Sequence, residues 1–484
     1  MSRKIIGPFN RVEGDLEVQL EFDGDTVTDA WVVSPLYRGF ERILVGKAPE
    51  DALVYTPRIC GICSVAQSVA AAKALQMAKG LTMPHNGRLS HNLVLAAENI
   101  ADHLTHFYLF FMPDFCRDTY QTEDWFQEVQ PRFKSVQGTS AKEMLKARAE
   151  FMHLLGILAG KWPHSLALQP GGTTRTIGQQ DQIRCIGILA SFRQYLENTL
   201  FGCSLEEITS VKSKSALADL FSQGKPATSD MGLFLKASSQ LELIKKGQGP
   251  DLFLSYGVYD EEDSTLYKQG TVEAGDYAVL SQEAIAEDVS HSWMAEQSEA
   301  LHPFEGATVP DAEQSDGYSW CKAPRLNKKP AEVGALARHV VDEHPLFQEL
   351  ATGNQGNVEA RIVARLMEIA EVVMAMEGWA RQLHPGEPIC NHASMDDTAE
   401  GYGLMEAARG SLGHWIKVKN GRILNYQIIA PTTWNFSPRD KDGAKGPLEM
   451  ALIGAACRAD EKEQPAMVQH IVRSFDPCMV CTVH

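Results

Sequence analysis

The sequence predicts a mainly helical α+β fold with small peripheral antiparallel sheets. Three observations indicate it: long stretches in the middle of the chain carry apolar residues at three- and four-residue intervals, and a β-hairpin pattern stands near each of the two ends. The chain has 484 residues, 44% of them hydrophobic, which is enough for one large or two ordinary domains. No internal repeat divides it, so we expect a single domain over residues 1–484.

The first predicted element is a β-hairpin. Apolar and polar residues alternate from Leu16 to Phe22, Asp23-Gly24 interrupts the run, and a second extended segment follows over Thr26–Val33. An Asp-Gly pair between two such segments is a strong hairpin signal, because glycine readily adopts the positive φ that the tight turn needs.

Helices are predicted over most of the remaining chain. In five segments the apolar spacing matches one face of an α-helix. These segments are 64–79, 89–111, 141–158, 181–199 and 358–383. We therefore expect a helical body.

Two further features follow the first four helical segments. The segment 249–330 is richer in Asp, Glu, Ser and Gly and has weak periodicity. We expect a peripheral elaboration of short strands and loops there, and not a disordered linker, since Trp293 and Phe304 still offer core anchors. A second hairpin is predicted near the C-terminus, where Trp415–Lys419 and Arg422–Tyr426 flank an Asn-Gly pair.

Composition excludes several classes of protein. The formal net charge of −17 and the pI near 5.4 argue against nucleic-acid binding, which needs clustered Lys and Arg. The most apolar windows are interrupted by charged or polar residues well before the roughly 20 residues that a bilayer demands. The N-terminus shows no long apolar stretch with a cleavage site, so we expect a cytoplasmic protein, although a partner with an export signal could still carry it across a membrane.

The 10 cysteines are too few and too scattered for a disulfide scaffold in a chain of this length. Four of them form two Cys-x-x-Cys pairs, Cys60 with Cys63 and Cys478 with Cys481. The other six are expected to be small buried hydrophobes. They are Cys116, Cys185, Cys203, Cys321, Cys390 and Cys457.

The two pairs indicate a metal centre. The Cys-x-x-Cys spacing lets two thiolates converge on one point, and a helix N-terminus after Cys63 would lower the thiol pKa. Four thiolates are the ligand set of zinc, of iron-sulfur clusters or of another soft transition-metal centre. A zinc knot would be favoured if about 15 to 20 residues separated the pairs, but nearly the whole chain lies between them. A zinc staple stays possible, and a redox dithiol is disfavoured because neither pair follows a strand in a compact βαβ unit.

The residues around the pairs carry a more specific resemblance. The segments Arg58–Cys63 and Asp476–His484 are similar to the two signature motifs of nickel-iron hydrogenase large subunits. Further blocks resemble that family in family order: Arg11–Gly14, Tyr37–Glu41, Asp102-His103 with His106–Tyr108, Pro170–Gly172, Glu406–Gly410 and Pro431–Asn435. The resemblance covers the whole chain. It implies the large-subunit fold with a central helical bundle, and a hydrogenase that cleaves dihydrogen heterolytically into protons and electrons.

The resemblance also implies a ligand set. Cys60 and Cys478 would be terminal ligands of nickel, and Cys63 and Cys481 would bridge to an iron that carries carbon monoxide and cyanide. Electron-rich sulfur stabilises changing nickel oxidation states, and bridging thiolates leave an open position between the metals. Heterolytic cleavage needs a base and a route for the proton. A terminal thiolate can take the proton first, and Glu13 matches the family's proton-relay glutamate.

Other matches surround the expected centre. Arg409 matches the arginine above the metals, whose planar cation can donate to a cyanide nitrogen and order nearby carboxylates, here Asp102 and Asp476. The family usually has proline where this chain has Ala408, so backbone rigidity beside Arg409 is not implied. The residues that match the contact with the other cyanide are Pro431 and Thr432.

A second metal and a partner are implied as well. Glu41 and His484 match the ligands of a structural divalent ion, usually magnesium, which would hold the C-terminus. The chain has no spare clustered cysteines to carry electrons, so we expect it to bind a small subunit that contains iron-sulfur clusters.

Two positions bear on the role within the family. Ile62 stands where dihydrogen-oxidising members usually have valine, and Phe110 where they usually have leucine. If these bulkier residues line the gas route as in relatives, they narrow it, so that dihydrogen passes while the larger oxygen is retarded; repacking of the core is the structural alternative. The pair resembles the regulatory, dihydrogen-sensing subclass, which would control hydrogenase gene expression, turn over slowly and bind a histidine kinase.

Two other roles stay open. The first is a respiratory uptake hydrogenase. The second, a metal-free scaffold like the related subunit of respiratory complex I, is disfavoured because that relative lacks the four thiolates. Most family precursors carry an extension beyond the final histidine, whereas sensing members resemble this chain in stopping at His484; a processed enzyme would look the same.

Overall fold

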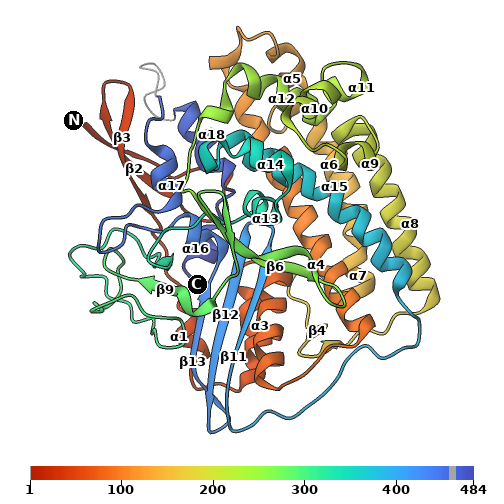
Figure 1. The fold of residues 1–484 in the computed structure, drawn as a ribbon, viewed down its shortest axis with the longest axis vertical. Helices are drawn as coiled ribbons and strands as arrows, with labels where there is room; N and C mark the ends of the chain where they lie inside the picture. Colours follow the sequence, from red (N-terminus) through yellow and green to blue (C-terminus); the bar gives the residue numbers. More distant parts are fainter. Residues whose placement is uncertain (1, 457–464) are drawn as a thin grey trace.

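The fold is seen in a computed structural model that describes residues 2–456 and 465–484 (Figure 1). Its helices are α1 (Phe40–Leu44), α2 (Ala52–Tyr55), α3 (Ser64–Ala78), α4 (His85–Thr105), α5 (Phe126–Phe133), α6 (Thr139–Phe151), α7 (His153–Ala159), α8 (Gln179–Tyr195), α9 (Leu205–Thr209), α10 (Lys214–Leu220), α11 (Gly224–Ala227), α12 (Asp230–Gln240), α13 (Ala335–Val341), α14 (Pro345–Leu350), α15 (Val358–Gln382), α16 (Pro431–Asn435), α17 (Pro447–Leu452), α18 (Ala466–Ser474) and α19 (Met479–Thr482). Its strands are β1 (Ser2–Ile6), β2 (Glu17–Asp23), β3 (Thr26–Val33), β4 (Leu168–Gln169), β5 (Gly172–Thr173), β6 (Leu252–Asp260), β7 (Thr265–Glu273), β8 (Asp276–Ala278), β9 (Ile285–Asp288), β10 (Ala323–Leu326), β11 (Thr398–Ala407), β12 (Gly410–Lys419) and β13 (Arg422–Ile429).

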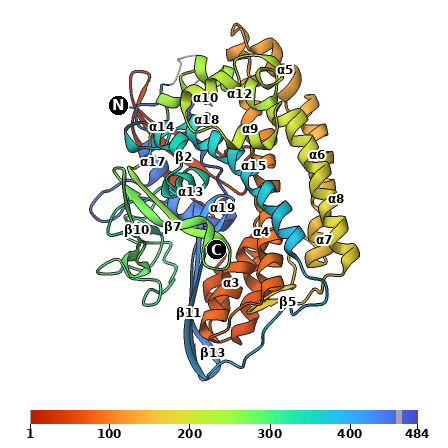
Figure 2. The ribbon, with the colours of Figure 1, turned by 45° about the vertical axis from the view of Figure 1, so that its right-hand side comes forward.

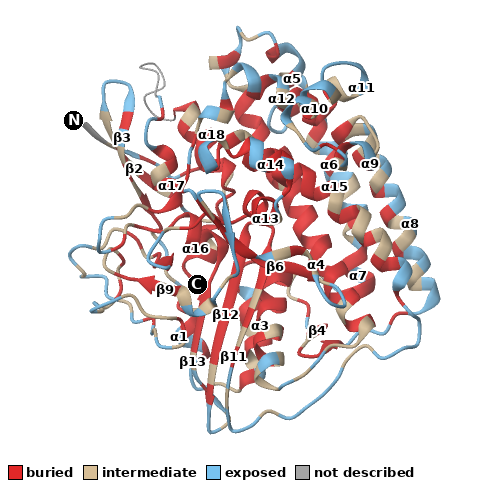
Figure 3. Cartoon of the chain, in the orientation of Figure 1, coloured by how far each residue is buried: buried red, intermediate tan, exposed pale blue. Residues whose placement is uncertain are grey.

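The helical body is built around α4 and α15. These two helices pack on each other, α7 and α8 pack against them, and the four lie side by side in both views (Figures 1 and 2). The 25-residue α15 starts where the Asn357 side chain accepts the N–H of Ala360, which supplies one of the hydrogen bonds that a first helical turn lacks. Figure 3 shows α4 buried along most of its length, whereas α8 has an exposed outer face. The predicted mainly helical fold is confirmed.

Small residues let one sheet lie directly on a helix. Strand β11 packs along α3, whose buried face there is made of alanines. A Cβ added at Gly403 would lie 2.0 Å from the carbonyl oxygen of Ala70, and one added at Gly401 would lie 2.2 Å from that of Ala74. Larger residues at these two positions would push the strand away from α3. This packing sets the sheet against the helix that begins directly after Cys63.

The sheets are small and antiparallel, as predicted. The N-terminal hairpin forms β2 and β3, and β1 adds to the edge of β2. The C-terminal hairpin forms β12 and β13, and β11 extends it to three strands. Within residues 249–330, β6 and β7 pair with each other, and β6 is buried along nearly its whole length because it also packs on α13 and β11.

The two ends of the chain meet in space. Glu13 forms an isolated parallel bridge with Cys478, in which the Met479 N–H donates to the Glu13 carbonyl oxygen at 2.7 Å. Nearby, the Arg473 side chain donates to the Asn10 carbonyl oxygen at 2.7 Å. The last residue, His484, is only 4% exposed. The N-terminal segment and the last turn of chain therefore form one packed unit.

Within residues 2–456 and 465–484, we find no helix that combines the length and the apolar character needed to cross a membrane. The expectation that all lone cysteines are buried is wrong in part: Cys185 and Cys321 are buried, whereas Cys116, Cys203 and Cys390 are half-exposed. Cys457 lies outside the described residues.

Candidate metal centre

The two cysteine pairs converge, as the sequence predicts. The sulfur of Cys60 lies 3.6 Å from that of Cys478, and the sulfur of Cys63 lies 3.0 Å from that of Cys481. Cys478 and Cys481 are 3.1 Å apart at sulfur, and all four sulfurs lie within 4.8 Å of one another. All four side chains are buried. Four donors from opposite ends of the chain therefore surround one point.

Local structure sets the direction of each thiol. Cys63 immediately precedes α3, Cys478 immediately precedes α19, and Cys481 lies within α19. The Ile62 N–H donates to the Cys60 sulfur at 3.3 Å, which closes the first loop. The Arg38 guanidinium, which lies in the block Tyr37–Glu41 but was not predicted as a site residue, joins the two loops by donating to the carbonyl oxygens of Ile59, at 2.5 Å, and of Val480.

The donor set fits a soft metal ion. Contacts with the three neighbouring sulfurs lower the pKa of Cys60 well below its usual value, whereas the same kind of contact raises the pKa of Cys63 and Cys481 well above theirs. Four negative charges this close repel one another unless a cation lies between them. Thiolate sulfur prefers nickel, zinc or iron to hard ions such as magnesium. The residues present therefore fit a nickel-containing group.

Glu13 lies at the edge of this centre. Its backbone is fixed by the bridge to Cys478, and its side chain is half-buried. Burial and the charge of Cys60 raise the pKa of Glu13, against the opposing influence of Arg409 and Arg38. A carboxyl group with a raised pKa next to the thiols is suited to accept and release a proton.

Arg409 joins two buried carboxylates beside the cysteines. Its guanidinium contacts both oxygens of Asp102, and it donates to Asp476 through the side chain at 3.1 Å and the main-chain carbonyl at 3.0 Å. Burial raises the pKa of Asp102 to about 7, while Arg409 lowers the pKa of Asp476 in spite of its burial. Asp476 also has a positive φ of 57°, a left-handed conformation that such contacts must hold in place.

Pro431 and Thr432 stand at the start of α16 and are buried. The Thr432 hydroxyl oxygen accepts the N–H of Cys478 at 3.2 Å, which leaves its own proton free to donate to a ligand. The main chain at Ala408 is hydrogen-bonded to Arg338, a residue that sequence reasoning missed. Its guanidinium donates to the Ala408 carbonyl at 3.2 Å; a charge among the mainly apolar residues of α13 was the available signal.

Glu41 and His484 are brought together as well. The imidazole Nε2 of His484 lies 3.3 Å from a carboxylate oxygen of Glu41. Sequence reasoning missed Lys322, whose ammonium lies 3.6 Å from Glu41 and 2.6 Å from Glu287, both buried. Although burial opposes ionisation, Lys322 and His484 lower the pKa of Glu41 to about 2. The carboxylate is thus held ionised, as a cation ligand must be.

The predicted gas-route residues lie in different elements. Ile62 is half-buried within the first cysteine loop. Phe110 is half-buried in the π-helical turn His106–Phe111 that continues α4, and its carbonyl oxygen accepts from Arg11 at 3.3 Å. Nothing in these positions tests a role in gas access, so this stays a prediction.

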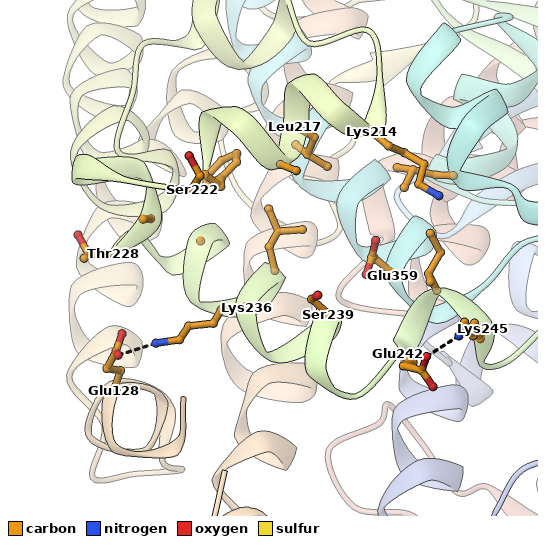
Figure 4. Close-up of a pocket in the computed structure, with 17 residues that line it drawn as sticks. Glu128, Lys214, Leu217, Ser222, Thr228, Lys236, Ser239, Glu242, Lys245 and Glu359 are labelled. Carbon is orange, nitrogen blue, oxygen red and sulfur yellow. Dashed lines mark hydrogen bonds and ion pairs between the residues drawn. The ribbon is translucent and has the colours of Figure 1, made fainter. Parts of the chain in front are cut away.

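A surface cavity lies apart from the centre. It has a volume of about 760 Å³ and lies between α10, α12 and α14, and none of the predicted site residues lines it (Figure 4). Figure 4 shows two of its lysines paired with glutamates, Lys236 with Glu128 and Lys245 with Glu242. The charges of these two lysines are therefore already compensated.

Comparisons with known proteins agree with this geometry. A family model described as nickel-dependent hydrogenase matches residues 38–124 and 139–484. The periplasmic NiFeSe hydrogenase large subunit of Desulfomicrobium baculatum is 30% identical over 99% of this chain and 94% of its own length. The uptake hydrogenase large subunit of Rhodobacter capsulatus is 26% identical over 100% of this chain and 95% of its own length.

Solved structures give the same result. The Ni-Fe-Se hydrogenase from D. vulgaris Hildenborough in the reduced state superposes with a TM-score of 0.84 and 29% sequence identity, and the match covers 100% of both chains. The similarity therefore includes both ends, where the cysteine pairs lie.

Proposed function

The chain belongs to the nickel-dependent hydrogenase family and is a hydrogenase large subunit, and from this premise we propose that its four buried cysteines hold a nickel-iron centre at which dihydrogen is cleaved heterolytically. The observation that carries the proposal is the convergence of four buried sulfurs from opposite ends of the chain. We further propose that Cys60 and Cys478 bind nickel alone, that Cys63 and Cys481 bridge to iron, and that the iron carries carbon monoxide and cyanide.

The centre, when bound, supplies adjacent metals that accept dihydrogen and its two electrons. The chain supplies the remaining functions. A cysteine thiolate and then Glu13 accept the proton, because both are bases at the centre and Glu13 is nearer the surface. With the group bound, Arg409, held by Asp476, would offer a fixed planar cation to one cyanide, and Thr432, whose oxygen accepts from Cys478, would offer its hydroxyl proton to the other. Burial of the four thiols excludes bulk water from them.

Metal analysis and infrared spectroscopy of the purified complex test the proposal. We expect one nickel for each chain, iron in excess of that in the partner's iron-sulfur clusters, and infrared bands of metal-bound carbon monoxide and cyanide. Zinc in place of nickel, with no such bands, would instead support a structural zinc staple and contradict the proposal.

Substituting Glu13 by glutamine is expected to lower the rate of dihydrogen oxidation by about 10² to 10⁴-fold, because an amide keeps the shape but cannot accept a proton. Nickel content should stay unchanged, since the bridge to Cys478 uses only the Glu13 main chain. The rate is measured with an artificial electron acceptor. Glu17→Gln, which alters another half-buried carboxylate near the N-terminus, is the control. A Glu13→Gln enzyme with full activity would exclude this residue from the proton route.

The large-subunit names of the relatives imply a small-subunit partner for this chain. We propose that this partner contains iron-sulfur clusters that take the electrons. The reaction could run toward oxidation of dihydrogen or toward its formation. The uptake hydrogenase among the relatives favours oxidation, in the uptake role that the sequence left open as an alternative.

Dihydrogen sensing is a second candidate function, favoured by Ile62 and Phe110. Under it the chain would signal to a histidine kinase and turn over slowly. The relatives compared above do not include a regulatory subunit, so this role rests on those two positions alone.

The double variant Ile62→Val, Phe110→Leu tests the oxygen-gate hypothesis. Smaller side chains should widen a gas route that both residues line, so dihydrogen oxidation should become sensitive to oxygen. The measurement is activity during exposure to defined oxygen concentrations. Ile186→Val, Phe22→Leu is the matched control, because these residues are also half-buried against the core. If the double variant tolerates oxygen as the wild type does, Ile62 and Phe110 do not form a gate.

We also propose that Glu41 and His484 bind magnesium at the C-terminus. Support comes from their 3.3 Å approach and from the ionised state of Glu41. Metal analysis of the purified complex should also find magnesium. A complex without magnesium would contradict this proposal and would show that the Lys322 ammonium is the cation that neutralises Glu41.

A further inference from the structure

Glu98 is a buried carboxylate that receives four hydrogen bonds at the base of the first cysteine pair. It lies on α4 and is 2% exposed. Its two oxygens accept the main-chain N–H groups of Val65 and Ala66, each at 2.9 Å. The hydroxyl of Ser64, at 3.3 Å, and the indole N–H of Trp162, at 2.8 Å, donate to the same carboxylate. All four hydrogen-bond partners of the Glu98 carboxyl group are therefore donors.

These bonds complete the N-terminus of α3. The helix begins at Ser64, directly after Cys63, and the Cys63 side chain makes no capping hydrogen bond. The first N–H groups of a helix have no partners within the helix and need acceptors from elsewhere. Glu98 provides them from another helix. The main chain that follows Cys63 is thus fixed by α4.

The segment Trp162–His164, which we call the strap, fixes the rest of the loop. A Cβ added at Gly61, between the two cysteines, would lie 4.0 Å from the Pro163 ring, so the strap lies directly against the loop. The His164 N–H donates to the Ser64 hydroxyl oxygen at 3.3 Å, after the loop. The His164 ring Nδ1 lies 2.9 Å from the Pro57 carbonyl oxygen, before the loop. The strap therefore contacts the loop at its beginning, middle and end.

The strap itself is held by α4 and α6. Its Trp162 is bonded to Glu98, and the Arg148 guanidinium lies 5.6 Å from the centre of the Trp162 ring while donating to the Ala101 carbonyl at 3.2 Å. His164 has a φ of 62°, a left-handed conformation that is unfavourable for a residue with a side chain and persists only where the surroundings enforce it. Glu98 adds a second link between the strap and α3, because it accepts from both Trp162 and Val65.

We propose that Glu98 is a positioning residue for the metal centre: through α3 and the strap it sets the orientation of Cys60 and Cys63. This inference rests on the proposed function of the four cysteines. Helix α4 would then direct two carboxylates to the centre from one face, one turn apart. Asp102 binds Arg409 beside the metals, and Glu98 holds the loop beneath them.

The position requires two acceptor oxygens, because the N–H groups of Val65 and Ala66 donate to different ones. Four groups donate hydrogen bonds to the two oxygens of Glu98, so neither oxygen can be replaced by a donor without the loss of at least one of these bonds. Glutamine has one oxygen and one NH₂ group, and either orientation points that NH₂ at an N–H of Val65 or Ala66. The variant should therefore release the first turn of α3 while it keeps the shape and volume of the side chain.

The test compares Glu98→Gln with the wild type in the intact complex with its small-subunit partner. We expect displaced carbon monoxide and cyanide infrared bands and an altered nickel paramagnetic resonance spectrum. We also expect a loss of nickel affinity or activity of about 10- to 100-fold, the usual effect of removing a group that orients metal ligands. Trp162→Phe removes a single donor and should displace the same bands by less. If Glu98→Gln gives no folded complex, the spectra of Trp162→Phe decide the matter.

Glu449→Gln is the matched control for the carboxylate. Glu449 is also fully buried and accepts from the N–H of Val32, the N–H of Gly446 and the hydroxyl of Tyr318, but it lies on α17. It should lower stability and leave the spectra of the centre unchanged. Wild-type spectra in Glu98→Gln, or in Trp162→Phe where only that variant folds, would overturn the positioning role. A wild-type complex without nickel or infrared bands would instead reject the proposed function itself.

Discussion

Replacing Cys478 by alanine is expected to abolish dihydrogen oxidation and to lower nickel affinity by more than about 100-fold, because loss of a ligand should exceed the 10- to 100-fold effect of losing a group that only orients one. The Cys478 sulfur is fully buried and contacts the sulfurs of Cys60 and Cys481, so no water molecule or neighbouring side chain can take its place easily. The main chain at this position is held independently by Thr432 and Glu13, so the fold around the missing sulfur should persist.

The measurements are nickel content and dihydrogen oxidation of the purified variant. Cys185→Ala is the matched control, since Cys185 is a fully buried lone cysteine on α8. It should lose some packing energy and keep its nickel. A Cys478→Ala protein that retained a full complement of nickel would show that the four sulfurs do not form the metal site.

Replacing Arg409 by lysine is expected to lower kcat/KM for dihydrogen by about 10² to 10³-fold, the usual effect of removing one fixed donor from a charged active site. Lysine keeps the charge but is a single point donor, and it cannot hold Asp102 and Asp476 at once as the planar guanidinium does. One buried carboxylate would lose its partner, which costs about 3–5 kcal/mol when a buried ion pair is broken. Nickel should remain bound, because Arg409 is not a ligand.

The comparison variant is Arg325→Lys. Arg325 is equally buried and binds the carboxylate of Asp440, the Ser437 hydroxyl and main-chain carbonyls. A loss of stability in both variants with a loss of kcat/KM only in Arg409→Lys would assign a catalytic role to Arg409. Equal kcat/KM in Arg409→Lys and the wild type would remove Arg409 from the reaction and leave it a structural residue.

Regular periodicity predicted several elements well. The segment 358–383 is α15 almost to the residue, and 64–79 is α3, because long amphipathic or apolar runs have few alternatives to a helix. The segment 141–158, expected as one helix, is two, α6 and α7, which separate at Met152. No Gly or Pro stands at that break, so the local sequence does not signal it.

Strand β11 was missed for a related reason. Its residues, Thr398–Ala407, include glycines at 401 and 403, which usually argue against a strand. These glycines are required because the strand lies against the main chain of α3. The sequence around β11 therefore gives no indication of the strand, because its glycines are explained only by a helix about 330 residues earlier in the chain.

The sequence by itself determined which residues could carry the chemistry. The two Cys-x-x-Cys pairs specified soft metal ligands, because side-chain chemistry is a property of residue type. The resemblance of the blocks around Glu13, Arg409 and Glu41 to the hydrogenase family predicted a base, a cation and a second metal site. Only the tertiary structure decided where these groups lie and what holds them there. Contacts between residues far apart in sequence depend on packing of whole elements, so the positions of Arg38, Glu98 and Arg338 could not be predicted from the chain around them.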